Sequence, residues 1–330
     1  MQSEGAAVRP ATAEAPSGGR LVAALDIGGT KIAGALVDGE GRLLARALRP
    51  TPAAQDGATV MAAVAEVLGE LTADPAWVRV TAVGIGSAGP VDASHGTVSP
   101  VNVPGWRGFP LVERVREVTG PLPVTLTGDG VAIAAAEHWQ GAARGYDNAL
   151  CMVVSTGVGG GFVLNGALHP GPTGNAGHIG HISVDLDGPL CPCGARGCVE
   201  RLASGPNIAR RALDNGWRPQ AGQEPTAEAV AAAARAGDPV AAASFARAAQ
   251  ALAAGIAAAA TLVEIEVAVI GGGVAGAGEV LFAPLRDHLR AYATLSFASG
   301  VRVLPAQLGT DAGLVGAAAA AFGGALRARG

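Results

Sequence analysis

Two segments of the sequence share one pattern, in which an apolar strand ends in a glycine-rich turn and a second strand follows. The first segment spans residues 20–48 with the turn "DIGGTK", and the second spans residues 148–171 with the turn "STGVGGG". Apolar residues at helical spacing predict further helices. They are expected at residues 56–73, 206–215, 226–236, 239–260, 281–291 and 312–328, with a strand, a short turn and a helix over residues 122–139. The alternation predicts two α/β domains with a cleft between them.

The length, the hydrophobic fraction and the net charge narrow the class of protein. The 330 residues, 49% of them hydrophobic, suffice for two cores, and the net charge of −4 argues against a nucleic-acid partner. The longest apolar run, residues 251–263, is too short to cross a bilayer. The chain does not begin with a basic region and an apolar core, so we expect a cytoplasmic protein. Residues 1–20, rich in Ala, Pro, Gly and Ser, are expected to be a disordered tail.

The glycine-rich turns have the composition of a phosphate-binding site. Gly28 and Gly29 allow successive backbone N–H groups to surround an anion. Thr30 adds a hydroxyl donor, and Lys31, the only lysine of the chain, adds a cation. Asp26 is a candidate ligand for hydrated Mg²⁺, which prefers one or two carboxylates together with phosphate oxygens.

Two further turns extend this prediction. The second turn offers Thr156, Gly157, Gly159 and Gly160, and a third strand end, Gly271 to Gly273, suits the close packing of a base or ribose. Each turn alone is as well explained by chain reversal, and none matches the Walker or the Rossmann pattern. Together the three turns predict a nucleotide-phosphate site.

A cysteine cluster indicates a metal site. Cys191, Cys193 and Cys198 have the spacing C-x-C-x4-C, and in a reducing compartment such clusters more often bind metal than form disulfides. A structural zinc site needs four ligands, and either His181 or His178 can be the fourth. The alternative is a set of reduced, buried thiols. Cys151 stands apart in an apolar run and is expected to be a buried free thiol.

The segments "LDIGGTK", "STGVGGG", "GHIGH", "CPCGARGCVE" and "VIGGG", in this order, resemble the ROK (repressor, open reading frame, kinase) family of sugar kinases over residues 21–325. The resemblance implies a two-domain hexokinase/actin-like (ribonuclease H-like) fold with ATP in the cleft between the domains. Residues 21–127, joined by a C-terminal helix 310–328, would form the small domain. Residues 128–309, with a zinc-binding segment at 178–200, would form the large one.

The resemblance also assigns roles. Asp129 would be the catalytic base, although the residues alone equally suit a helix N-cap. The ATP-phosphate segments would be residues 24–31 and 157–164, and His181 would complete the zinc site. A homodimer or homotetramer is expected. The residues implied to bind the sugar are Gly89, Asn102, Asp129, His178, His181 and Glu200.

Two departures from the family pattern bear on the sugar. Gly128-Asp129-Gly130 replaces the usual Asn-Asp-Ala, and His178 stands where glucokinases of the family carry Glu. "AGHIGH" is more similar to the bacterial N-acetylmannosamine kinases. We therefore expect transfer of the ATP γ-phosphoryl group to the 6-hydroxyl of an N-acetylhexosamine, most of all N-acetylmannosamine. The alternatives are a glucokinase, an N-acetylglucosamine kinase and a non-catalytic sugar sensor.

Overall fold

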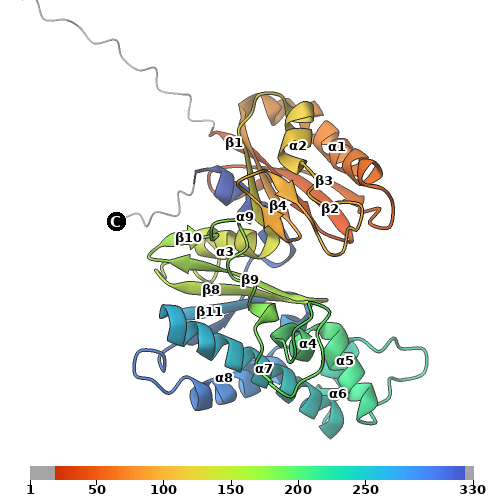
Figure 1. The fold of residues 1–330 in the computed structure, drawn as a ribbon, viewed down its shortest axis with the longest axis vertical. Helices are drawn as coiled ribbons and strands as arrows, with labels where there is room; N and C mark the ends of the chain where they lie inside the picture. The colour runs from red at the N-terminus through yellow and green to blue at the C-terminus, as the bar shows by residue number, and fades with distance from the viewer. Residues whose placement is uncertain (1–18, 324–330) are drawn as a thin grey trace, which may run out of the picture.

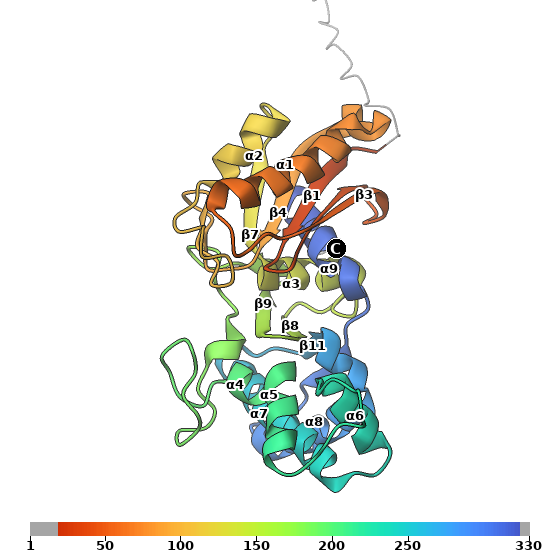
Figure 2. The same ribbon diagram turned by 90° about the vertical axis from the view of Figure 1, so that its right-hand side faces the viewer.

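The computed structural model describes residues 19–323, which form two five-stranded β-sheets, with helices between and outside them, and one two-stranded sheet (Figure 1). Seen from the side, α3 (Asp129–Gln140) and α9 (Ala312–Ala321) lie between the two sheets, and the remaining helices cover the outer faces (Figure 2). Residues 1–18 of the predicted tail and residues 324–328 of the predicted C-terminal helix lie outside the described part of the chain.

Both sheets have the same topology. In each, the first three strands pair antiparallel and two later strands add in parallel beside the first of them. The first sheet has the order β3-β2-β1-β4-β7, with β1 (Leu21–Ile27), β2 (Lys31–Val37), β3 (Leu43–Pro50), β4 (Val80–Ser87) and β7 (Val124–Gly128). The second has the order β10-β9-β8-β11-β12, with β8 (Ala149–Val154), β9 (Val158–Leu164), β10 (Ala167–His169), β11 (Val267–Gly271) and β12 (Arg302–Pro305).

The central strands are apolar on both faces because helices cover both faces. On β1, Leu21 and Leu25 pack toward the outer helices α1 (Gly57–Ala73) and α2 (Leu111–Thr119). The alternate residues Val22 and Ala24 pack against α9. On β8 the same alternation directs Leu150 and Met152 outward and Ala149 and Cys151 toward α3. The outer face of the second sheet is covered by α4 (Val199–Ala203), α5 (Gly205–Asp214), α6 (Ala227–Arg235), α7 (Pro239–Val263) and α8 (Glu279–Tyr292).

The two central helices touch through small residues. A Cβ on Gly316 of α9 would overlap the backbone carbonyl of Ala132 in α3. The crossing therefore depends on glycine and alanine. It brings the start of α3, which follows β7 without a break, against the second sheet. The domain boundary predicted at residues 127–128 falls at this junction and stays a prediction.

Two sequence-based expectations need correction, and one helix was missed. The C-terminal helix ends at Ala321, because Gly323 takes the left-handed conformation (φ 87°) that commonly terminates helices. No turn separates β7 from α3. Helix α2 was not predicted, although Leu111, Val112 and Val115 have helical spacing and are buried.

Helix α7 is longer than its uninterrupted apolar run suggests. It has 25 residues, and its most apolar window has a mean hydropathy of 1.4, so its length and composition alone would suit a membrane span. Of that window, 56% is buried inside the protein, where α7 packs against α4, α6 and α8. Its apolar composition is therefore explained by its place in the core on the outer face of the second sheet. That the protein has no membrane partner stays a prediction.

Candidate active site

The backbone of β9 is the surface on which the predicted site residues assemble. A Cβ built on Gly130, in the first turn of α3, would lie 2.8 Å from the Gly160 nitrogen. One on Gly177 would lie 2.7 Å from the Gly160 oxygen, and one on Gly180 would lie 2.9 Å from the Val158 carbonyl carbon. Only glycine permits such approaches. The helix that carries Asp129 and the segment that carries both histidines therefore rest on the same strand.

Asp129 is the first residue of α3; part of the residue reaches the surface, while its carboxylate is largely surrounded by protein. The helix N-cap is Gly128, so the structure does not support an N-cap role for Asp129. The Gly130 N–H donates to Asp129 Oδ1 over 2.7 Å. The surrounding protein desolvates the carboxylate and raises its pKa, which the Gly130 hydrogen bond partly opposes. A carboxylate with a raised pKa at a helix start is suited to accept a proton.

Asp26, on β1, is a second carboxylate close to the first. Burial, and then the charge of Asp129, raise its pKa from 3.8 to about 6, while Lys31 acts in the opposite direction. A Cβ on Gly313, at the start of α9, would lie 2.5 Å from the Asp26 carboxyl carbon. Gly313 thus leaves room for this carboxylate. Two neighbouring carboxylates with raised pKa values suit a divalent cation, which would relieve their repulsion.

The first glycine turn is held at both ends. The Gly28 N–H donates to the Lys31 oxygen over 3.0 Å, and the Thr51 hydroxyl donates to the Gly28 oxygen over 2.7 Å. Thr30 and Lys31 are exposed. A Cβ on Gly29 would lie 2.6 Å from Cγ of Asn102. Asn102, expected to bind sugar, therefore lies against the expected phosphate turn.

The second glycine turn meets Glu200 of α4. The Val158 N–H donates to Glu200 Oε2 over 2.9 Å, and a Cβ on Gly157 would lie 2.8 Å from the same oxygen. Within residues 19–323, Oε1 of Glu200 makes no hydrogen bond and remains available to a ligand. A Cβ on Gly159 would meet nothing within 4 Å, so this position faces open space. Gly160 instead lies under Gly130 and Gly177, a packing role that its sequence pattern did not indicate. Its role in phosphate binding stays a prediction.

The two histidines lie together beside the loop that holds Gly89. Their ring centroids are 6.3 Å apart. A Cβ on Gly89 would lie 3.7 Å from His178 Cε1 and 3.7 Å from Asn175 Oδ1. The pKa of His178 is lowered by desolvation and by His181, against the charge of Glu200. His178 is therefore an uncharged imidazole at neutral pH, adjacent to two other predicted sugar ligands.

The geometry of the cysteine cluster suits one metal ion. The ligand atoms of His181, Cys191, Cys193 and Cys198 all lie within 4.8 Å of one another. Cys191 Sγ is 3.9 Å from His181 Nδ1, and Cys193 Sγ is 3.7 Å from Cys198 Sγ. A tetrahedral zinc ion with Zn–S bonds of about 2.3 Å needs ligand separations of about 3.8 Å. His181, rather than His178, supplies the nitrogen of this cluster.

Two contacts of Asp185 hold the loop that carries the three cysteines. Arg247 of α7 forms an ion pair with Asp185. A Cβ on Gly197 would lie 2.6 Å from the Asp185 carbonyl carbon, and Gly197 has a positive φ of 59°. Burial and the neighbouring thiols raise the pKa of Cys198 to about 12. A bound cation is the usual means of holding such crowded sulfurs as thiolates.

The third glycine turn lies beside a cavity of about 310 Å³ between α6, α7 and the 3-10 turn Gly273–Ala277. A Cβ on Gly272 would lie 2.8 Å from the Val154 carbonyl carbon, and Gly272 has a φ of 88°, so the turn requires glycine. The volume is in the range of small-ligand sites. The residues that line it are Ala227, Glu228, Ala231, Arg235, Phe245, Gly273, Val274, Gly276 and Ala277. Most of them were not predicted, because the sequence does not show which helix covers the turn.

Two other features of the described residues lie apart from this site. A hollow of about 570 Å³ is lined by Arg20, Asp38, Arg42 and Phe322, among others, and contains none of the predicted ligands. Asp92, Ser94 and His95 are hydrogen-bonded to one another, but they belong to an exposed turn in which Asp92 Oδ1 also accepts both backbone N–H groups. This is a local turn interaction and not a nucleophilic triad.

Comparison with known proteins places these features in a family. The ROK family model matches residues 22–323. A glucokinase from Thermotoga maritima is 36% identical over 89% of this chain and 95% of the relative. An N-acetylmannosamine kinase from Yersinia pseudotuberculosis is 39% identical over 89% of this chain and 96% of the relative. The crystal structure of a ROK family glucokinase from Streptomyces griseus, in complex with glucose and AMPPNP, aligns with a TM-score of 0.76 and 37% identity over 92% of this chain and 99% of that chain. The predicted hexokinase/actin-like fold class is confirmed.

Proposed function

Because the chain belongs to the ROK family, we propose that it transfers the γ-phosphoryl group of ATP to the 6-hydroxyl of an N-acetylhexosamine, with N-acetylmannosamine as the preferred acceptor. The chain is an ATP-dependent sugar kinase. The acceptor is the finer proposal, since glucokinases and N-acetylmannosamine kinases are similar to it at 36% and 39% identity.

Asp129 is proposed as the base. Its carboxylate stands at the start of α3, where the helix rests on β9, and its raised pKa increases its ability to accept the proton of the attacking hydroxyl. Phosphoryl transfer depends mostly on positioning and charge stabilisation. The rigid glycine contacts beneath α3 would provide that positioning.

ATP is proposed to lie across the three glycine turns. The adenosine would enter the cavity beside Gly273, and the phosphates would meet the backbone N–H groups of the first two turns, with Lys31 and Thr156 at their ends. Asp26 would hold the Mg²⁺ that accompanies the nucleotide, an assignment supported by its raised pKa beside Asp129. When bound, Mg²⁺ neutralises charge that develops on the phosphates.

A structural zinc ion is proposed for the cluster of His181, Cys191, Cys193 and Cys198. With Nδ1 of His181 toward the metal, its Nε2–H is left to donate to a sugar hydroxyl, so the metal would fix the orientation of a substrate ligand. Four protein ligands leave no position for a metal-bound water, which supports a structural role. Glu200, with Oε2 fixed by Val158, would accept from sugar hydroxyls through Oε1.

The observation that carries the acceptor proposal is the position of the His178 imidazole beside His181, Glu200 and Gly89, where desolvation lowers its pKa and favours the uncharged ring. A carboxylate at this position would bind adjacent hydroxyls strongly as an anionic acceptor. A neutral imidazole instead offers an uncharged nitrogen acceptor, which suits the N–H of an acetamido group.

The test is His178→Glu, assayed with glucose, N-acetylglucosamine and N-acetylmannosamine. We expect the ratio of kcat/KM to shift toward glucose by at least about tenfold, the value of one substrate hydrogen bond. An unchanged ratio would show that His178 does not determine the acceptor.

A glucokinase is the second candidate, supported by the likeness to the glucose-bound structure. We further expect a cytoplasmic homodimer or homotetramer without nucleic-acid or membrane partners.

A further inference from the structure

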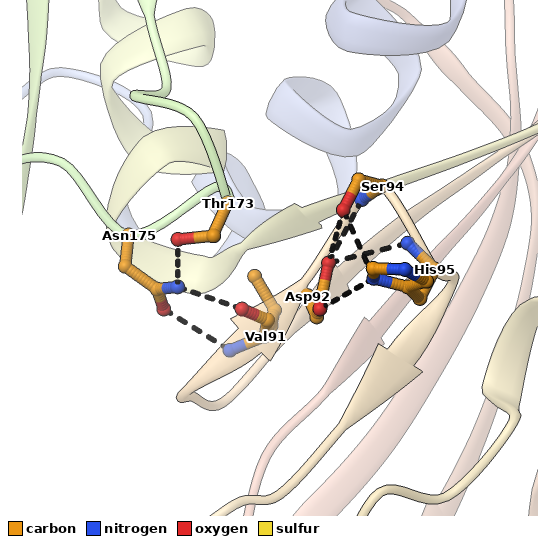
Figure 3. Close-up of polar contacts among 6 residues, drawn as sticks. All are labelled: Val91, Asp92, Ser94, His95, Thr173 and Asn175. Atoms are coloured by element: carbon orange, nitrogen blue, oxygen red, sulfur yellow. Dashed lines mark hydrogen bonds and ion pairs between the residues drawn. The ribbon is translucent and has the colours of Figure 1, made fainter.

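The side chain of Asn175 links two segments that are distant in the sequence (Figure 3). Its Oδ1 accepts the Val91 N–H over 3.0 Å, and its Nδ2 donates to the Val91 oxygen over 2.6 Å. Nδ2 also donates to the Thr173 hydroxyl over 2.9 Å, and the Ala93 N–H donates to the Thr173 oxygen over 3.0 Å. The loop of residues 173–175 is therefore fastened to β5 (Val91–Asp92) of the hairpin that follows Gly89.

Asp92, the residue after Val91, stabilises the turn of the same hairpin. In Figure 3, Asp92 faces Ser94 and His95, and its Oδ1 accepts their backbone N–H groups over 3.2 Å each. Asp92 Oδ2 lies 2.8 Å from His95 Nδ1. Val91 itself pairs with Val98 in the hairpin, so the backbone groups that Asn175 binds belong to a paired strand.

These contacts determine which way the Asn175 amide faces. A backbone N–H can only donate and a backbone C=O can only accept, so the amide oxygen must lie at Val91 N and the amide nitrogen at Val91 O. The reversed amide would place donor against donor and acceptor against acceptor. Its orientation therefore follows from the hydrogen-bond network.

The oxygen so fixed also faces His178, whose Nε2 lies 3.4 Å from Asn175 Oδ1. An amide oxygen accepts only, so a hydrogen bond at this contact requires the proton on the ring nitrogen that faces it. We infer that Asn175 is a positioning residue that holds His178 with the proton on Nε2 and leaves Nδ1 as an acceptor for the sugar. The second half of this inference rests on the proposed function, and the tautomer itself does not.

This tautomer determines which polar groups of the sugar can bind at His178. With Nδ1 as acceptor, His178 receives a hydroxyl or the N–H of an acetamido substituent, and it cannot donate to an acetamido carbonyl unless it is protonated. The loop, through Asn175, would therefore decide which polar atom of the substrate is accepted at this position. Gly89 lies on the other side of the ring and leaves space next to His178 Cε1, because only an added Cβ would come into contact with that atom, at 3.7 Å.

The test is ¹⁵N NMR of the imidazole nitrogens in the ligand-free full-length chain at about pH 8, where an imidazole is neutral. The chain has six histidines, and His178→Gln assigns the signal of His178. We expect wild-type His178 to show a protonated Nε2 and an unprotonated Nδ1. Asn175→Ala should make the two nitrogens converge toward averaged shifts. A protonated Nδ1 in the wild type, or unchanged shifts in Asn175→Ala, would overturn the inference.

Two further variants separate the acceptor from the fastening of the loop. Asn175→Asp keeps an oxygen toward Nε2 but removes both Nδ2 donations, so the Nε2–H tautomer should persist. Thr173→Val removes one of those donations without touching His178 and should leave the tautomer unchanged. In kinetics, Asn175→Ala should reduce kcat/KM for the acetamido sugar by about tenfold, with an unchanged KM for ATP. An equal loss for all sugars would reduce Asn175 to a structural role; the expected tautomer without activity on any acetamido sugar would contradict only the proposed acceptor.

Discussion

Gly130 lies on the backbone of Gly160 so closely that a Cβ would come within 2.8 Å of the Gly160 nitrogen. Both partners are backbone, so neither can yield by rotating a side chain. The family pattern has alanine at this position, but the packing of this chain leaves no room for a Cβ, so Gly130→Ala should lift the start of α3 from β9 and displace Asp129. We expect kcat to fall about a hundredfold or more, the effect of a displacement of about 1 Å, together with a lower Tm.

The matched control for that substitution is Gly69→Ala in α1, where an added Cβ meets nothing within 4 Å. It should preserve kcat and raise stability by about 0.5–1 kcal/mol, since alanine is the better helix former. Equal kcat in wild type and Gly130→Ala would show that the α3–β9 contact does not position the site.

Asp129→Asn tests the base. The amide cannot accept a proton, so kcat should fall about 10²–10⁴-fold while KM for sugar and ATP changes little. Because the pKa of Asp129 is raised and the base acts when ionised, wild-type activity should be lost as pH falls through a pKa above that of an ordinary carboxyl. Asp287→Asn, at an exposed ion pair on α8, serves as the control. Retained kcat in Asp129→Asn would exclude Asp129 as the base.

Asp26 should make the ligand-free protein less stable as pH rises. Its folded pKa of about 6 lies above the unfolded value of 3.8, so the stability it contributes is present below pH 3.8 and lost as pH rises through 6. Asp26→Asn should therefore have a higher Tm than wild type above pH 6 and the same Tm near pH 4. It should also weaken binding of Mg²⁺–ATP. Thermal melts from pH 4 to 8 measure the first effect; a constant Tm difference across this range would contradict it.

The proposed zinc site predicts both the zinc content and the thermal stability of the protein. Purified protein should hold about one zinc ion per chain, and Cys193→Ser or removal by a chelator should lower both zinc content and Tm, because ligand binding to the folded state stabilises it. Cys151→Ala is the control, since Cys151 is buried apart from the cluster in the apolar contact between β8 and α3, where alanine introduces no polar group. Active wild-type protein with almost no zinc would refute the site.

Much of the fold was predictable because its signals are local. The strand–glycine turn–strand units and the helical spacing identified both sheets and most helices, and the resemblance supplied the fold class. The end of α9 was not predicted, because the alanine-rich sequence continues beyond Ala321 and only the left-handed Gly323 ends the helix.

The candidate site was predictable in its residue types and only partly in its contacts. The spacing of Cys191, Cys193 and Cys198 indicated a metal but left His178 and His181 equivalent; the resemblance named His181, and the structure brings its Nδ1 to the cysteine cluster. Asn175 was missed, because a polar residue in a glycine-rich loop carries no signal of the distant Val91 that it binds. Gly313 was missed for the same reason, since its partner Asp26 is far away in the sequence.

The most direct test of the acceptor is kcat/KM of the wild type for N-acetylmannosamine and for glucose at saturating ATP, measured as ADP release with the product identified as a 6-phosphate. The uncharged His178 predicts a ratio that favours N-acetylmannosamine by about tenfold or more, the value of one discriminating hydrogen bond. A ratio that favours glucose would contradict the proposal and establish the chain as a glucokinase.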